Sequence, residues 1–421
     1  MTGSYWQEAA GWADRWVGRP WPRAVEFAVL GGGFAGLATA RHLRLRHPTA
    51  RIVVLEAARV GHGASGRNAG FLSPLAAPVW LLGAERAAEQ AWGAAWINAE
   101  VHALARWIGE AVPAAELRPA TLALQAHGRL ATAALHAFTR AVAHVGLAHE
   151  VRPSRARPGG TVLMLPAYTL QPYALCHGLA AHVVELGVEI HERARVRRVE
   201  GLRAGGARVH LEDGARIEAA RVIACTNAYS GTIAFGERPA ALVVHGCLAV
   251  TAPGAAAAGV RDGDFTVEVT AAQAYHRLHA DRLVLGGLDA LRAPGADAFD
   301  LPAAARAHLQ ALIAARLGPG GPPLAHAWSG RFHATATGLP IVRTSDNNPA
   351  LVWNVGYGGA GVALALACAR LAAGVAADGT FADADEPRLL ALIHATRIAA
   401  RDGVRAVGRI AAAAAMPWRV G

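Results

Sequence analysis

The sequence of 421 residues predicts an α/β fold with two domains. The first is expected to be discontinuous and built around a parallel sheet, and the second to be an α+β domain on an antiparallel sheet. Three observations indicate this. A β-rich run at residues 25–30 is followed by glycines and a segment with helical periodicity, and a second glycine-rich turn at 356–361 leads into another apolar helical segment. The region from about 240 to 327 contains short strand-like runs.

The turn after residues 25–30 carries the spacing of a dinucleotide-binding motif. Gly31, Gly33 and Gly36 fit the pattern G-x-G-x-x-G, and Phe34 and Ala35 lie between the last two glycines. In such a turn the first glycine permits a sharp bend, the second lets the backbone approach a pyrophosphate, and the third lets the helix pack on the strand. The helix N-terminus offers N–H groups to the phosphates. We expect these five residues to contact a dinucleotide; the alternative is a glycine turn without a ligand.

An acidic residue at the expected distance supports the dinucleotide. The strand at residues 51–55 is followed by Glu56, which lies 20 residues beyond Gly36 and has Ala57 after it. An acid at this place binds a ribose hydroxyl in dinucleotide-binding units. NAD and FAD both use such a unit, so these residues alone do not separate the two.

A polar, glycine-rich loop follows Glu56, where a simple nicotinamide enzyme would continue into another helix and strand. Its glycines allow the backbone to fold tightly. Ser65, Arg67 and Asn68, with the backbone at Gly66, place donors where a second phosphate or a ring edge would lie. The loop therefore favours a ligand that extends beyond the first pyrophosphate contact.

Composition argues against several other classes of protein. All 41 basic residues are arginine and are scattered, so the net charge of +10 does not indicate nucleic-acid binding. The 4 cysteines include no C-x-x-C pair and the 19 histidines no H-E-x-x-H pair, so we expect no metal site and buried free thiols. No apolar run reaches the roughly 18 residues of a membrane span, and the N-terminus carries charges and prolines, so we expect a cytoplasmic protein.

Taken in order, these segments resemble the D-amino-acid oxidase superfamily of FAD enzymes, and within it the branch that contains the glycine, sarcosine and gamma-glutamylputrescine oxidases. The residues Ser4 and Tyr5, the turn at 31–36 and the GASGRNAG loop at 63–70 follow the order of the last of these, with Ala69 in place of a glycine. The resemblance implies that the dinucleotide is FAD.

Later segments extend the resemblance over most of the chain. It implies that the backbone at Val196 contacts the adenine and that Thr226 and Asn227, in an ATNAY segment, lie at the strand end that closes the FAD domain. After Trp328 it also implies a set of backbone contacts to the cofactor, at Gly330, Gly358, Gly359, Gly361 and Val362.

The second glycine turn has an electrostatic role in the family. It places the N-terminus of the following helix against the pyrimidine edge of the flavin, where reduced flavin is anionic, and a positive helix end stabilises that charge. Thr337 replaces the acidic residue that is usual near the Leu-Pro pair.

The resemblance also implies how the chain is divided. Residues 1–75, 155–235 and 328–421 would form a Rossmann-like FAD-binding domain with a C-terminal helical extension, and residues 76–154 and 236–327 the substrate domain. We expect residues 76–154 to be helical, because they are rich in alanine, tryptophan and leucine.

The implied activity is oxidation of the C–N bond of a small amine or amino acid by hydride transfer to flavin N5, giving an imine that hydrolyses. The alternatives are a FAD-dependent hydroxy-acid oxidoreductase and a catalytically silent flavoprotein that serves as a binding partner. We expect non-covalent FAD, because no cysteine lies near residues 337–342 and Asn68 occupies the place of the linking histidine of some relatives. The acceptor is oxygen, or a quinone or another carrier, since the lysine that promotes reaction with oxygen in sarcosine oxidases is absent.

Four residues are candidates for substrate binding, and no catalytic side chain is expected because flavin carries the chemistry. Strand alternation puts Tyr275 and Arg277 on one face of a strand pair, where relatives often hold a substrate carboxylate with an arginine. A solvent-facing Arg277 is the alternative. The resemblance places His333 and Tyr357 near the isoalloxazine.

Near the C-terminus, Arg397, Arg401, Arg405 and Arg409 recur at steps of four, which aligns them on one face of a helix. We favour a solvated face. The alternative is a peripheral contact with an anionic membrane surface.

Overall fold

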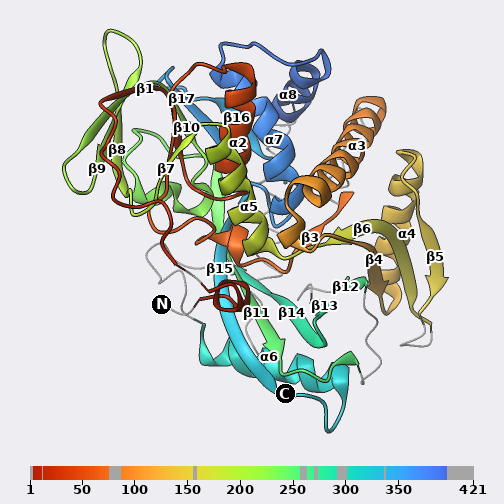
Figure 1. Cartoon of the computed structure of the whole chain (residues 1–421). Coiled ribbons are helices and arrows are strands. Elements are labelled where there is room, and N and C mark those ends of the chain that lie inside the picture. Colours follow the sequence, from red (N-terminus) through yellow and green to blue (C-terminus); the bar gives the residue numbers. More distant parts are fainter. Residues whose placement is uncertain are drawn as a thin grey trace.

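The computed structural model describes residues 3–11, 13–74, 87–154, 159–256, 263–269, 274–291, 301–335 and 338–395. Two sheets organise these residues, and helices pack on both (Figure 1). Thr337 and the arginine stripe at 397–409 lie outside the described residues.

The first sheet has a parallel core that begins at β1. In spatial order its main row is β16 (Ile341–Thr344), β17 (Leu351–Val355), β10 (Arg216–Ala224), β1 (Ala24–Leu30), β2 (Ile52–Leu55) and β7 (Glu189–His191). Neighbours in this row are parallel, except that β16 is antiparallel to β17. The carboxyl ends of the parallel strands therefore meet at one edge, where open α/β sheets bind their ligands.

Helices cover one face of this sheet and a β-meander covers the other. The helices are α2 (Phe34–Arg46), α5 (Pro172–Glu185) and α7 (Gly361–Ala376), and the meander adds β8 (Val196–Gly201) and β9 (Ala207–Leu211) to β10. Alternation along β1 serves both layers, because Phe27 and Val29 lie in the helix-side core while Ala28 and Leu30 lie in the meander-side core. This explains why the strand is apolar on both faces.

The second sheet carries the opposite half of the molecule. In spatial order its strands are β15 (Leu324–Thr335), β11 (Ala241–Thr251), β14 (Arg282–Leu291), β13 (Tyr275–His279), β12 (Asp264–Glu268), β4 (Arg118–Ala126), β6 (Thr161–Thr169) and β3 (Phe71–Leu72), with β5 (Glu150–Pro153) on β6. Every pair is antiparallel except β4 with β12. The predicted antiparallel sheet is therefore present, with one parallel pair.

The two faces of the second sheet have different coverings. Cys247, Leu283 and Leu285 pack against α6 (Ala303–Leu317), which lies at the end of the molecule farthest from α8 (Asp385–Ala395) in Figure 1. On the other face, Leu248 and Trp328 pack with Trp6 of α1 (Tyr5–Ala9). Leu278 lies on the α6 side and Tyr275 on the α1 side, so the predicted alternation along β13 is confirmed.

The expectation that residues 76–154 are helical is wrong in part. They contain α3 (Ala87–Ala111) and α4 (Arg129–His144), but also β4 and β5. β4 is held on both edges, by β6 and by β12, which are distant in the sequence. Such pairing overrides the helical propensity of an alanine- and leucine-rich segment.

Three strands lie in the second sheet although all or part of each was assigned to the FAD-binding domain. They are β3, at residues 71–72, β6, at residues 161–169, and β15, which crosses residue 328. The domain boundaries stay a prediction.

Over the described residues, no helix has the length and apolar character needed to cross a membrane. Within the same ranges, no group of His, Cys, Asp and Glu side chains is arranged to hold a metal ion. The cysteines Cys176, Cys225, Cys247 and Cys368 are buried free thiols, as predicted.

Candidate cofactor site

The glycine turn after β1 leaves no room for larger residues. Gly31 adopts a φ of +106°, which disfavours side chains. A Cβ at Gly36 would lie 1.9 Å from the carbonyl oxygen of Gly31, and a Cβ at Gly33 would lie 2.7 Å from Ser65 Oγ. The turn therefore fits the close backbone approach that a pyrophosphate requires.

The N-terminus of α2 lies at this glycine turn. Gly33 caps the helix and supplies no side-chain hydrogen bond. The N–H of Phe34 donates to Ser65 Oγ at 3.0 Å, so the loop at 61–70, which we name the flavin loop, lies directly over the helix end. Ala35 and Gly36 form the buried first turn behind it.

Glu56 lies beside the glycine turn, where the sequence predicted an acid. Its Oε2 accepts a hydrogen bond from the N–H of Gly32 at 2.7 Å, and its Oε1 accepts one from the N–H of Ala58 at 2.8 Å. Burial raises the pKa of this carboxyl, and the two backbone N–H groups partly offset the effect. Ala57, which lies between Glu56 and Ala58 in the sequence, is exposed.

Polar side chains of the flavin loop bind the protein itself. The Asn68 amide donates to the carbonyls of Ala64 and Ser65, at 3.1 and 2.8 Å, and accepts from the N–H of Gly70 at 2.8 Å. Asn68 therefore acts by closing the loop, a role that the motif did not indicate.

Arg67 ties the flavin loop to β15. Its side chain is fully buried, its Nε donates to the carbonyl of His62 at 2.8 Å, and its Nη1 donates to the carbonyl of Ser329 at 3.2 Å. A Cβ at Gly330 would lie 3.5 Å from Arg67 Cβ, an ordinary contact distance, so the arginine stem packs beside this glycine. Burial lowers the pKa of Arg67 to about 10, which leaves it charged at neutral pH.

The segment after β10 meets the second glycine turn. The side chain of Asn227 accepts a hydrogen bond from the N–H of Gly356 at 3.1 Å, and the hydroxyl of Thr226 lies 2.8 Å from that of Ser230.

Val196, at the start of β8, is buried in the meander-side core. The N–H of Ala194, two residues earlier, donates to the carbonyl of Glu56 at 2.8 Å. The segment predicted to contact the adenine therefore lies beside Glu56, the residue predicted to bind the ribose.

The turn at 356–361 lies against β15. Gly358 and Gly359 have φ values of +56° and +87°, and the N–H of Gly358 donates to the carbonyl of His333 at 3.0 Å. α7 then begins at Gly361 and Val362, without a side-chain cap. A Cβ at Gly359 would lie 3.8 Å from the ring of Phe332, a residue that the motif analysis missed. Strand alternation places Phe332 on the same face of β15 as Gly330 and Trp328, and this pattern in the sequence was the signal that could have indicated it.

The four candidate substrate residues fall into two pairs. Tyr275 and Arg277 lie on β13; Tyr275 contacts the ring of Phe71 edge-on, at 5.7 Å between centroids. Arg277 is 3% exposed, so the solvent-facing alternative is wrong. Its Nη2 donates to the carbonyl of Leu170 at 2.8 Å, and its guanidinium lies 5.2 Å from the Trp6 ring.

His333 and Tyr357 form the second pair, at the glycine turn. Burial, with a smaller effect of Arg331, lowers the pKa of His333 to about 4, so it is neutral at neutral pH. The Tyr357 hydroxyl, which has one hydrogen to donate, lies 2.7 Å from the backbone carbonyl oxygen of Asn354 and 2.8 Å from its side-chain oxygen. Tyr357 therefore points into the core beneath the turn.

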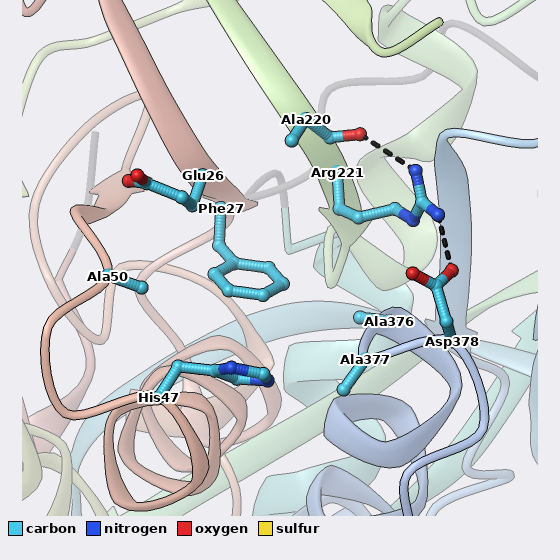
Figure 2. A pocket seen from close by; sticks show the side chains of 9 residues that line it. All are labelled: Glu26, Phe27, His47, Ala50, Ala220, Arg221, Ala376, Ala377 and Asp378. Atoms are coloured by element: carbon cyan, nitrogen blue, oxygen red, sulfur yellow. Dashed lines mark hydrogen bonds and ion pairs between the residues drawn. The ribbon is translucent and has the colours of Figure 1, made fainter.

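A separate hollow of about 260 Å³ does not belong to this site. Its lining includes Glu26 and Phe27 near the start of β1, and it holds an ion pair between Arg221 and Asp378 (Figure 2). The glycine turn and Glu56 follow the other ends of β1 and β2. Ligands of open α/β sheets bind at those carboxyl ends, so the hollow is not a cofactor site.

Comparison with known proteins identifies the dinucleotide. Residues 26–375 match the family described as DAO, FAD dependent oxidoreductase. The chain belongs to this family of FAD-dependent oxidoreductases. Its cofactor is FAD, and the glycine turns, the uncapped helix ends and the partly buried carboxylate of Glu56 fit that group.

Individual members are more distant. The probable oxidoreductase OrdL of Rhizobium meliloti (strain 1021) is 26% identical over 385 residues, which cover 85% of this chain and 84% of the relative. Glycine oxidase from Geobacillus kaustophilus superposes with a TM-score of 0.71 at 18% identity, covering 87% of this chain and 98% of the oxidase. L-Proline dehydrogenase from P. horikoshii gives a TM-score of 0.69 at 14% identity, with 85% and 95% coverage. These structures confirm the fold class that the sequence predicts for this FAD-dependent oxidoreductase.

Proposed function

We propose that the protein oxidises the C–N bond of a small amine or amino acid, releasing an imine that hydrolyses in water. The family match carries the proposal, because it makes the chain a FAD-dependent oxidoreductase. Two proteins of similar fold, a glycine oxidase and an L-proline dehydrogenase, are named for amino-acid substrates. FAD supplies the redox step by accepting a hydride at N5.

Residues at the first turn would hold the adenosine and pyrophosphate part of FAD. The N–H groups of Gly33, Ala35 and Gly36 at the start of α2 would bind the pyrophosphate, beside the N–H of Phe34 that Ser65 holds, and Glu56 would accept hydrogen bonds from the ribose. The backbone at Val196 would contact the adenine. Thr226 and Asn227 would bound the cofactor from the strand end.

Residues at the second turn would adjust the flavin. The N-terminus of α7 carries a partial positive charge that stabilises negative charge beside it by about 0.3–1 kcal/mol at an exposed site. The helix is apolar and almost fully buried, where such an interaction is stronger. Gly358 and Gly359 would let the ring system approach the backbone next to Phe332.

The substrate would be oriented by side chains and oxidised without a protein nucleophile. Arg277 remains our candidate for a substrate carboxylate, with Tyr275 beside it on β13. His333 is neutral at neutral pH, so it adds no charge that would repel a protonated amine, and it would accept a hydrogen bond from the substrate nitrogen. Tyr357 would support the turn from below.

The reduced enzyme would pass its electrons to oxygen or to a quinone or another carrier. The chain contains no lysine, so any cation that assists the reaction with oxygen must be an arginine or a histidine. Arg67, within the flavin loop, is buried and charged and fits that requirement.

Product analysis tests the proposal. The purified protein, loaded with FAD, is incubated with amines, N-methyl amino acids and amino acids, either in air or with an artificial electron acceptor. We expect release of ammonia or a primary amine together with a carbonyl compound. Turnover of hydroxy acids alone would favour the hydroxy-acid alternative, and no turnover of any compound would favour a catalytically silent flavoprotein.

A further inference from the structure

The short helix α1 begins with a closed capping arrangement. The hydroxyl of Ser4 accepts a hydrogen bond from the N–H of Gln7 at 3.3 Å, and the Gln7 side-chain oxygen accepts one from the N–H of Ser4 at 2.8 Å. A helix of 5 residues is not stable alone. Its order must therefore come from the surface on which it docks.

That surface is the flavin loop. Ser4 Oγ donates to the carbonyl of Gly66 at 2.6 Å, and the Trp6 indole N–H donates to the carbonyl of Asn68 at 2.8 Å. The Gln7 amide donates to the carbonyl of Gly61 at 3.0 Å. All three side chains have an exposed fraction of 0%, so these bonds are made away from water.

The same loop meets FAD-binding elements with its other groups. Ser65 Oγ accepts from Phe34 at the N-terminus of α2, while the carbonyls of its neighbours Gly66 and Asn68 are held by α1. The loop thus lies between α1 and the helix that would carry the pyrophosphate. A loop rich in glycine loses much conformational entropy when it is ordered. Ordering it before the ligand arrives increases affinity.

The carbonyls of Gly61, Gly66 and Asn68 need the hydrogen-bond donors that α1 supplies. Gly66 packs closely against Gly61, because a Cβ at Gly66 would lie 2.1 Å from the carbonyl oxygen of Gly61. This leaves little space for water between these two parts of the loop. A buried carbonyl without a donor is costly. Loss of the donors would therefore favour other loop conformations.

We propose that α1 is a positioning element for FAD, in which Ser4, Trp6 and Gln7 hold the flavin loop in its FAD-binding conformation. The inference rests on the proposed function only for the shared FAD site, and it does not depend on which substrate is oxidised. Trp6 also lies over the guanidinium of Arg277, so the same element contacts the substrate sheet.

The first test is Gln7→Glu in the full chain. The carboxylate keeps the oxygen that accepts from the Ser4 N–H but removes the donor to the carbonyls of Gly61 and His62. We expect the Kd for FAD, measured by quenching of flavin fluorescence on the FAD-free protein, to rise about 10-fold or more. Ser4→Ala should also weaken binding, and Ser4→Thr, which keeps the hydroxyl, should restore it.

Trp353→Phe is the matched control. Trp353 is fully buried and its indole N–H donates to Glu237, but it lies in β17, in the meander-side core, away from the flavin loop. Trp6→Phe removes the same kind of hydrogen bond at α1. We expect both substitutions to lower the Tm of the FAD-free protein, and only Trp6→Phe to raise the Kd for FAD.

A purely structural role for α1 predicts a different result. If Gln7→Glu and Trp6→Phe lower the Tm but leave the Kd for FAD within about 2-fold of the Trp353→Phe value, the inference is overturned. Should Gln7→Glu fail to fold, the comparison of Trp6→Phe with Trp353→Phe decides alone. A wild-type protein that binds FAD but oxidises no amine would contradict the proposed function and leave this inference standing.

Discussion

The hydroxyl of Ser65 accepts a hydrogen bond from the backbone N–H of Phe34, 3.0 Å away, and this bond joins the two glycine-rich segments of the first half of the chain. Phe34 begins the helix that follows the dinucleotide turn, and Ser65 lies in the flavin loop. Phe34 and Ser65 are 31 residues apart in sequence, and in space their segments form one wall of the proposed cofactor site.

Gly33→Ala should disturb the wall directly. The new Cβ would lie 2.7 Å from Ser65 Oγ, so the loop must move away from the helix end. We expect the Kd for FAD to rise about 10-fold or more, because a shift of the loop removes contacts made at close range. Gly109→Ala, in α3, is the control, since its Cβ would meet nothing nearer than 3.9 Å. Equal FAD affinity in the two variants would contradict the placement of FAD at this turn.

Glu56→Gln should weaken FAD binding with little change in fold. The amide keeps one oxygen for a backbone N–H but cannot accept from both Gly32 and Ala58, and it removes the charged acceptor for the ribose. We expect an increase of about 10-fold in the Kd for FAD, measured by fluorescence titration. Glu189→Gln, which removes an exposed ion pair with Arg51, should leave the Kd unchanged. A Kd that does not change in Glu56→Gln would rule out the ribose contact.

Arg277→Met separates two roles for a buried arginine. If Arg277 binds a substrate carboxylate, the KM for amino acids should rise at least 10-fold while the KM for simple amines stays constant. If it serves only to donate to the carbonyl of Leu170 and to stack on Trp6, the Tm should fall and both KM values should stay within about 2-fold. Steady-state kinetics with a matched amine and amino acid distinguish the two results.

Local patterns in the sequence predicted the parts of this site that depend on short segments. The glycine turn, its strand and helix, Glu56 and the turn at 356–361 all follow from spacing and period, because each is specified by neighbouring residues. The strand alternation at Tyr275 and Arg277 was predicted for the same reason.

Contacts between distant segments could not be predicted in this way. The spacing of the flavin loop gave no sign that the side-chain amide of Asn68 closes the loop or that Arg67 reaches Ser329. β4 lies in an alanine-rich segment, and only its pairing with β6 and β12 makes it a strand. The sequence did not single out Phe332, because its ring comes close to Gly359 only in the folded chain.

Five partly or fully buried histidines predict that the protein is less stable in acid. Burial lowers the pKa of His42 and His276 to about 3, and that of His62, His177 and His333 to about 4, from an ordinary value of 6.5. Below pH 6.5 the unfolded chain takes up protons that the folded chain does not bind until pH 4 or lower, so the free energy of unfolding falls as the pH falls through this window.

Thermal unfolding between pH 8 and pH 4.5 measures the effect. We expect the Tm to decrease once the pH falls below about 6.5, with net proton uptake on unfolding. His276→Gln should flatten the decrease, because one such group is removed. A Tm that rises or stays level from pH 6.5 to pH 4.5 would contradict the neutral, buried state of these side chains.

Anaerobic reduction of the bound flavin tests the central claim most directly. The FAD-loaded protein is mixed without oxygen with each member of a panel of amines, N-methyl amino acids, amino acids and hydroxy acids, and the visible flavin absorbance is followed. We predict that at least one amine or amino acid bleaches the spectrum and that the same compound deuterated at the reacting carbon does so more slowly. Bleaching by hydroxy acids alone, or by no compound in the panel, would contradict the account.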